Sequence, residues 1–225
     1  MCDGTIVSVR QTFVLLPLLA LSLASRSTAQ EIRPDPKPIG RFVADVRAAF
    51  PKFKQDPAIA SAIDVAVGNL PGRTIGLVAG AHWYPARIGV MTLGIGGELM
   101  MAHASNTLAP ATKDAQPGPT GNARFSALSP QVSFNFGARD GWSYISGGIG
   151  RSHFTVERED HPVPDGDSGT KTINYGGGAR WFAKPHLAVS LDLRFYAINP
   201  QLATATRPAY PRMTMMVLTG GVGFR

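Results

Sequence analysis

The chain has few of the residues that disulfides, thiolate metal sites and membrane helices require. It contains one cysteine, Cys2, among 225 residues, and charged residues make up 16%, below the usual share of about a quarter. Beyond the N-terminal segment, no apolar run reaches the roughly 18 residues that a membrane helix needs. A disulfide scaffold, a cysteine-ligated metal centre and a bundle of membrane helices are therefore not expected. The 25 glycines and 18 prolines favour an all-β chain with many turns.

The first 29 residues have the pattern of a cleaved signal peptide. Arg10 precedes an apolar stretch at residues 12–24, and Ser27-Thr28-Ala29 offers the small residues that a signal peptidase needs. We predict cleavage after Ala29, which leaves the mature chain without a thiol. Residues 30–38 are polar and rich in proline, as in a flexible lead-in. An uncleaved membrane anchor is the alternative.

The mature chain is basic, with its charges scattered. Removing residues 1–29 lowers the basic and acidic counts from 22 and 15 to 20 and 14, a balance of +6. Because no basic cluster is present and the chain is exported, we expect no nucleic-acid partner. Attraction to anionic lipid headgroups or lipopolysaccharide fits the charge better.

Period-two alternation of apolar and polar residues recurs along residues 39–225 and indicates β-strands. Between Leu187 and Phe195, for example, every second residue is large and apolar. Most of these segments exceed the roughly nine to eleven residues that a tilted transmembrane strand needs. We predict strands near residues 39–50, 73–84, 89–104, 123–138, 141–154, 171–183, 186–199 and 212–224. This pattern predicts an all-β fold, an eight-stranded antiparallel transmembrane up-and-down β-barrel.

The predicted connections alternate strictly in length. Short turns fall at residues 85–88, 139–141 and 184–185, and long links at 51–72, 105–122, 155–170 and 200–211. Tight turns at one end and long loops at the other are typical of outer-membrane barrels, whose short turns face the periplasm. In the first long link, Asp56-Pro57 is a helix-start signal, so residues 54–69 favour a short helix or an ordered loop.

The tryptophans offer an independent test of this topology. Trp83, Trp142 and Trp181 each lie beside a short turn, and Phe224 ends the last strand at the same level. Aromatic side chains gather at membrane–water interfaces, so we predict that these four form a belt at the turn end. Ordinary aromatic packing near strand ends is the alternative. A second, weaker belt is predicted at the loop end from Phe50, Phe125, Phe154 and Phe195.

Strand parity also sorts the charged residues, which fall opposite the main apolar face of each strand. An Arg or Lys facing mid-bilayer lipid costs about 2–4 kcal/mol, so these residues are expected inside. An eight-stranded barrel is just wide enough for its own side chains to fill it. The predicted polar lumen network consists of Asp45, Arg47, Glu98, Gln131, Asn135, Arg151, Arg180, Asp192 and Arg194.

Two features fit this pattern less well. Placing Arg151 inside also turns Ile145 and Ile149 inward, which is unusual for a polar lumen. Pro130 falls within a predicted central strand, where it removes a backbone donor and predicts a bulge.

Two segments carry a family resemblance. Residues 173–198 (INYGGGARWFAKPHLAVSLDLRFYAI) and 217–224 (VLTGGVGF) are similar to the last hairpin and terminal strand of small bacterial outer-membrane β-barrels of the OmpA/OmpX type. The resemblance spans the mature chain, although Arg225 follows the aromatic residue that usually comes last. It implies an outer-membrane location, and recognition of the C-terminal strand by the barrel-assembly machinery. A monomer is expected.

Ser152, His153, Thr155 and Glu157 form the only local group with a hydroxyl, an imidazole and a carboxylate, as acyl transfer requires. Neighbouring strand residues need not meet, so we predict no catalytic residues, no cofactor and no metal site. The leading hypothesis is a non-enzymatic structural or surface-interaction barrel with a filled polar lumen. The alternatives are a small-solute channel, a lipid-modifying enzyme such as an acyl hydrolase or transferase, and a soluble lipocalin-like carrier.

Overall fold

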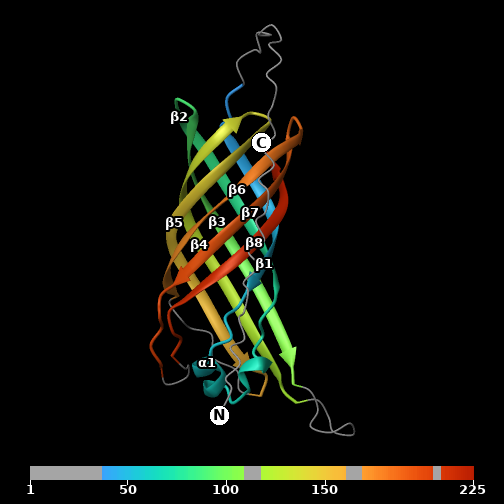
Figure 1. The fold of residues 1–225 in the computed structure, drawn as a ribbon, viewed down its shortest axis with the longest axis vertical. Coiled ribbons are helices and arrows are strands. Elements are labelled where there is room, and N and C mark those ends of the chain that lie inside the picture. The colour runs from blue at the N-terminus through green and yellow to red at the C-terminus, as the bar shows by residue number, and fades with distance from the viewer. Residues whose placement is uncertain (1–36, 109–117, 161–168, 205–208) are drawn as a thin grey trace, which may run out of the picture. The chain divides into compact units, whose positions relative to one another are not determined.

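The computed structural model describes residues 37–108, 118–160, 169–204 and 209–225. Within this part of the chain, eight antiparallel strands form one closed β-barrel (Figure 1). Each strand pairs with its neighbours in sequence, and β1 (Phe42–Lys52) pairs with β8 (Met213–Phe224) to close the barrel. The expected signal peptide, residues 1–29, lies outside the described residues, as does most of the lead-in. Among the residues described, no helix is both long and apolar enough to cross a membrane.

The predicted all-β class and all eight strands are confirmed. The six strands between β1 and β8 are β2 (Ile75–Ile88), β3 (Met91–Thr107), β4 (Thr120–Ala138), β5 (Gly141–Arg158), β6 (Thr170–Lys184) and β7 (Leu187–Ile198). The largest extension at the loop end is in β5, which was expected to stop at residue 154. Its pairing with β4 continues, with Val156 opposite Ala123, because β4 itself runs back to Thr120. Local sequence does not show how far two strands remain paired.

The two ends of the barrel differ as predicted. Two-residue turns join β2 to β3, β4 to β5 and β6 to β7, and Gly89 in the first adopts a left-handed φ of 60° that suits glycine. The first long link contains the predicted helix, α1 (Pro57–Ala62), and a short 3-10 turn at Val67–Asn69. The Asp56 side chain caps α1 by accepting a hydrogen bond from the Ala58 backbone N at 3.0 Å. Figure 1 shows α1 and the C-terminus at opposite ends.

The outer wall is apolar and much of the inner wall is polar. In β7, Leu191 is 51% exposed on the outside, whereas the adjacent Asp192 is 1% exposed inside. The same alternation runs around the barrel because successive side chains of a strand point to opposite faces. The exposed outer residues include Val46, Leu77, Ile95, Leu99, Leu128, Val132, Phe134, Ile173, Val189, Leu193, Leu218 and Val222.

Strand β5 turns the opposite face to the lumen from the one predicted. Ile145 and Ile149 are exposed on the outer wall, whereas Ser146 is buried inside. Arg151 shares the parity of the two isoleucines and is exposed outside, so its predicted place in the lumen is wrong. The faces of this Gly- and Ser-rich strand differ little in sequence. Pairing with β4 decides between them, because it sets Arg151 opposite the outward-facing Leu128.

The structure also corrects the predicted aromatic belts. Trp142 is buried inside the barrel, whereas Trp83, Trp181 and Phe224 are each more than half exposed on the outer wall. At the loop end, Phe50 faces outward, but Phe125 and Phe154 are buried in the lumen. Trp142, Phe125 and Phe154 were assigned to belts from their height along the strands, which does not distinguish the inner from the outer face.

Pro130 does not produce the predicted bulge. The register between β4 and β5 is the same on both sides of it, although Ser129 and Pro130 have no partner in that ladder. Glycine at position 148 lets the two strands approach closely here, because a Cβ on Gly148 would lie 1.9 Å from the Pro130 carbonyl oxygen. The observed register shifts lie instead at Trp83/Ala86 in β2 and at Phe182/Lys184 in β6, beside the short turns.

Candidate functional site

Six charged side chains meet in the middle of the lumen, and Arg47 of β1 lies at their centre. Its Nε is 2.8 Å from Asp45 Oδ1, and its Nη1 is 3.7 Å from Asp192 Oδ1. Its Nη2 forms an ion pair with Glu98. One buried guanidinium from β1 therefore contacts carboxylates from β1, β3 and β7. We call Asp45, Arg47, Glu98, Arg180, Asp192 and Arg194 the charge cluster.

The other two arginines extend the charge cluster across the barrel. Arg194 Nε is 3.2 Å from Glu98 Oε2, and Arg194 Nη2 is 3.1 Å from Asp192 Oδ2. Arg194 also donates hydrogen bonds to Gln131 Oε1 at 2.8 Å and to Ser146 Oγ at 2.9 Å. Arg180 pairs with Asp45 and donates to the Tyr84 hydroxyl oxygen at 3.1 Å. These contacts tie β1, β2, β3, β4, β5, β6 and β7 together.

The charge cluster is electrically balanced, with three arginines and three carboxylates, all 3% exposed or less. The sequence prediction had a fourth arginine, Arg151, which the fold places outside. Balance matters because an unpaired charge in a low-dielectric interior costs several kcal/mol. Gly80 provides room, since a Cβ there would lie 3.1 Å from Asp45 Oδ1.

Of the predicted amides, Gln131 joins the charge cluster and Asn135 bonds elsewhere. Both are buried in the lumen. Gln131 accepts from Arg194, whereas Asn135 donates to the Thr92 carbonyl oxygen at 3.0 Å and to Ser133 Oγ at 2.9 Å. Asn135 therefore belongs to a separate polar layer between β3 and β4, nearer the short turns.

An aromatic layer closes the turn end of the lumen. Ile39, Val43, Tyr84 and Trp142 form a buried cluster, against which Phe182 packs. The rings of Tyr84 and Trp142 meet edge to face with centroids 5.8 Å apart, and the Arg180 guanidinium lies 5.6 Å from the Trp142 ring. Ile39 comes from the segment before β1, where the Arg139 backbone N donates to the Lys37 carbonyl oxygen at 2.8 Å. This segment thus crosses to the turn between β4 and β5.

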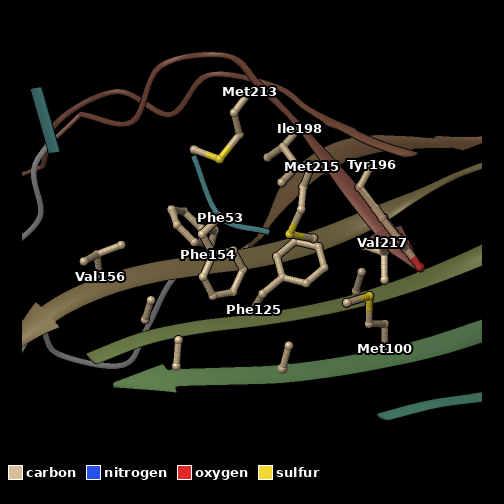
Figure 2. Close-up of a cluster of buried hydrophobic side chains, with 14 of the residues drawn as sticks. Phe53, Met100, Phe125, Phe154, Val156, Tyr196, Ile198, Met213, Met215 and Val217 are labelled. Atoms are coloured by element: carbon tan, nitrogen blue, oxygen red, sulfur yellow. The ribbon is translucent and has the colours of Figure 1, made fainter. Parts of the chain in front are cut away.

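An apolar layer fills the loop end of the lumen, and Figure 2 shows Phe53, Phe125 and Phe154 lying together inside it. The ring centroids of Phe53 and Phe154 are 5.3 Å apart. Ile59 and Ala60 of α1 belong to the same buried cluster, so the helix packs on this layer. We call it the loop-end cluster; its larger members are Phe53, Ile59, Leu70, Val78, Met100, Phe125, Phe154, Val156, Tyr196, Ile198, Tyr210, Met213, Met215 and Val217.

Charge parity predicts a polar lumen along its whole height, so the loop-end cluster was not predicted. A signal for it exists in β8, where Met213, Met215 and Val217 on one face alternate with Met216 and Leu218 on the other. A strand that is apolar on both faces has both faces covered, one by lipid or protein and the other by the lumen contents. By this rule, the sequence of β8 predicts that the loop end of the lumen is apolar.

The candidate catalytic group does not converge. Ser152 is fully buried inside, with its Oγ 2.6 Å from Thr172 Oγ1, whereas His153 faces outward. Glu157 lies on the outer side, where its Oε1 is 3.2 Å from Arg124 Nη2. Adjacent strand residues point to opposite faces, so Ser152 and His153 are separated by the barrel wall. In the described ranges, no three His, Cys, Asp or Glu residues group as metal ligands.

Comparison with known proteins gives distant structural similarities. No protein-family model matches the chain, and no curated protein does. Its fold is similar to the solved structures of Neisserial surface protein A (12% identity, TM-score 0.49, covering 81% of this chain and 96% of that one) and of Ail, the attachment invasion locus protein of Yersinia pestis (10%, 0.48, 83% and 98%). It is also similar to the outer membrane enzyme PagL (14%, 0.43, 80% and 99%).

At these identities the similarity concerns the fold alone. The fold conclusion rests on the strand pairing of the chain itself, which runs from β1 to β8 and closes. The chain is a closed eight-stranded antiparallel β-barrel, as its sequence predicted.

Proposed function

We propose that this chain is an integral β-barrel of the bacterial outer membrane with a filled, non-conducting lumen. The observation that carries the proposal is the contrast between its two faces. The outer wall exposes large apolar side chains on every strand, whereas balanced charges lie at the centre of the lumen. A bilayer is the solvent in which this arrangement is favourable, because apolar outward residues are then buried in lipid.

The same contrast argues against a soluble lipocalin-like carrier, which requires a polar exterior and an apolar ligand cavity. Leu77, Leu128 and Leu191 are each close to half exposed or more on the outer wall. In water, each would leave apolar surface unburied, and complete burial of a leucine side chain is worth about 1.5–3 kcal/mol. Contiguous outer surface of this kind favours a membrane or a protein partner.

Three layers argue against conduction through the lumen. The charge cluster spans the middle, with Trp142 and Tyr84 on its turn-end side and the loop-end cluster on its loop-end side. A solute would have to displace Arg47 and Arg194 from their carboxylates, at a cost of several kcal/mol. This arrangement supports a structural barrel and disfavours a small-solute channel.

The proposed role is non-enzymatic and is carried out at the loop end, through envelope reinforcement or contact with a surface partner. Support comes from the separation of Ser152 and His153 by the barrel wall, which removes the candidate for lipid acyl hydrolysis or transfer. In an outer-membrane barrel the loop end, where α1 lies, faces the outside of the cell.

Membrane assembly is tested by producing the precursor in a Gram-negative host. We expect the protein in the outer-membrane fraction, with a heat-dependent shift in mobility on SDS gels and an N-terminus at Gln30. A soluble periplasmic protein without a shift would overturn the membrane proposal. An N-terminus at Met1 would identify an uncleaved anchor.

Conduction is tested by inserting the purified barrel into planar bilayers. We expect no steady conductance from the unaltered protein. The matched control is Trp142→Ala, which opens only the turn-end layer and should still be blocked by the charge cluster. Reproducible conductance of the unaltered protein would contradict the filled lumen and favour the channel alternative.

A further inference from the structure

Arg225 lies at the turn end of the barrel, where its side chain joins three segments of the chain. The Arg225 Nε donates a hydrogen bond to the Pro185 carbonyl oxygen at 2.7 Å, and its Nη1 donates to the Arg139 carbonyl oxygen. A Cβ on Gly40 would lie 3.5 Å from Arg225 Cδ. Arg225 therefore contacts the β6–β7 turn, the β4–β5 turn and the segment that leads into β1.

Four further basic residues lie around Arg225. Lys184 and Arg41 are the chain neighbours of two residues that Arg225 contacts. Arg139 lies in the β4–β5 turn, and its backbone N donates to the Lys37 carbonyl oxygen at 2.8 Å. All four side chains are exposed. We call these five residues the turn-end basic patch: Lys37, Arg41, Arg139, Lys184 and Arg225.

Positive charge is in excess in the turn-end basic patch. Among the described residues, Asp140 is the one exposed carboxylate near it, and its Oδ1 is 4.0 Å from Arg225 Nη2. Within the same part of the chain, the other four cations form no ion pair. Cations that no carboxylate neutralises create a positive potential, which attracts anions.

The turn-end basic patch begins where the outward-facing aromatic residues end. Arg41 directly precedes Phe42, which is 52% exposed on the outer wall. Lys184 pairs with Leu187 across the β6–β7 turn, and Leu187 pairs on its other side with Phe224, which is 53% exposed. Because exposed aromatic rings mark the membrane–water interface, Arg41 and Lys184 lie at the height of lipid headgroups.

We propose that the turn-end basic patch binds the phosphate of an anionic phospholipid whose acyl chains lie along Val189 and Val222, which are partners on the outer faces of β7 and β8. The inference rests on the proposed membrane location and names the class of lipid that this end of the barrel prefers. Short turns face the periplasm, so the lipid belongs to the inner leaflet of the outer membrane.

Position favours a lipid over an acidic polymer or protein in the periplasm. Arg41 and Lys184 lie beside outward-facing apolar residues, so the anion that they bind is joined to an apolar tail. Free phosphate would satisfy the cations without using the apolar wall.

The tryptophans make a test specific to this end of the barrel. The chain has three, of which Trp83 and Trp181 are more than half exposed on the outer wall beside short turns and Trp142 is buried in the turn-end layer. Quenching of tryptophan fluorescence by a phospholipid with brominated acyl chains therefore reports lipid at the turn end alone.

The barrel is placed in phosphatidylcholine vesicles that contain increasing fractions of brominated phosphatidylglycerol, or of brominated phosphatidylcholine as the neutral probe. We expect the anionic probe to quench at lower fractions than the neutral one. The double variant Arg41→Gln/Lys184→Gln should lower this preference roughly 30-fold, since each basic residue near an anionic surface contributes about 1 kcal/mol. The matched control is Lys52→Gln/Arg73→Gln, which removes the same charge from two exposed partners at the loop end and should leave the preference unchanged.

A charge-conserving variant guards against a folding defect. Arg41→Lys/Lys184→Arg should keep both the heat-dependent gel shift and the preference for the anionic probe. An unchanged preference in the Gln double variant would overturn the site, as would loss of the preference in the charge-conserving variant.

Equal quenching of the unaltered barrel by the two probes would also overturn the proposal and leave the cations to an acidic partner in the periplasm. Loss of the preference on adding inorganic phosphate at the concentration of the anionic lipid would overturn it too, because it would indicate a small-anion site. Absence of quenching by both probes would instead contradict the proposed membrane location.

Discussion

Thr219 and Val217 lie two residues apart on the inner face of β8, yet they contact different kinds of side chain. Thr219 Oγ1 accepts a hydrogen bond from Arg47 Nη1 at 3.5 Å in the charge cluster. Val217, closer to the loops, is fully buried in the loop-end cluster. Within one small lumen, ion pairs therefore fill the middle and apolar side chains fill the loop end.

The two regions stabilise the barrel by different means. The charge cluster depends on direction and pairing, because each arginine is positioned by particular oxygens from other strands. The loop-end cluster depends on volume and area, which apolar packing rewards without strict geometry. Losing a member of the charge cluster should thus leave an unpaired charge, whereas losing a member of the loop-end cluster should leave a cavity.

The largest effect is expected in the charge cluster. Arg47→Met leaves Asp45, Glu98 and Asp192 with two arginines, and should lower the free energy of unfolding by about 3–5 kcal/mol. Urea titration of the barrel in lipid vesicles measures this. Adding Glu98→Leu restores the charge balance, so the double variant should lose less than the sum of the two single variants. Strict additivity would contradict coupling within the cluster.

At the loop end, Met100→Ala should lower the free energy of unfolding by roughly 2–5 kcal/mol through cavity formation. Met101→Ala is the matched control, because Met101 is the adjacent residue and is 52% exposed on the outer wall. The same titration in vesicles should show a much smaller loss for the control. Equal losses would mean that the inner and outer faces of β3 are not distinguished in the membrane.

Leu191→Arg tests whether the outer wall of the barrel faces lipid. Its charge would face lipid at a cost of about 2–4 kcal/mol, so the outer-membrane fraction should lose most of the heat-shifted form. Leu202→Arg, an 85% exposed position in the link before β8, is the control and should assemble normally. Full assembly of Leu191→Arg would argue against a lipid-facing wall.

The smallest effect is expected at the helix that covers the loop-end cluster. Asp56→Ala removes the cap of α1 and should destabilise it by about 0.5–2 kcal/mol. Hydrogen exchange should increase in residues 57–62 and leave the strands of the charge cluster unchanged. Asp56→Asn retains a capping oxygen and should restore protection. A loss of protection across the whole barrel would contradict a local role for the helix.

The strand order and the two ends of the barrel could be predicted from the sequence because the patterns that indicate strands, turns and helix starts are local. Period-two alternation identifies β7, and the Asp56-Pro57 pair identifies α1. The lumen position of all six members of the charge cluster was predicted from strand parity; Asp192 and Arg194, for example, share one parity within a clearly alternating strand. What local patterns could not provide was the partner of each charge.

The faces of β5 were not predictable from its own residues. Its glycines and serines give both sides similar polarity, so Arg151 was assigned to the wrong face. Only pairing with β4 and β6, which places Arg151 beside Leu128 and Lys171, decides the direction of each side chain. Such pairing joins residues distant in sequence, and its register is a property of the closed sheet.

The sequence by itself thus determined that the chain forms eight antiparallel strands with an apolar outer wall, because alternation is encoded residue by residue. Tertiary structure decided the balance of three arginines with three carboxylates, the apolar loop end beneath α1, and the outward Arg151–Lys171 pair. These features depend on which strands meet and at what height, and closure of the barrel sets both.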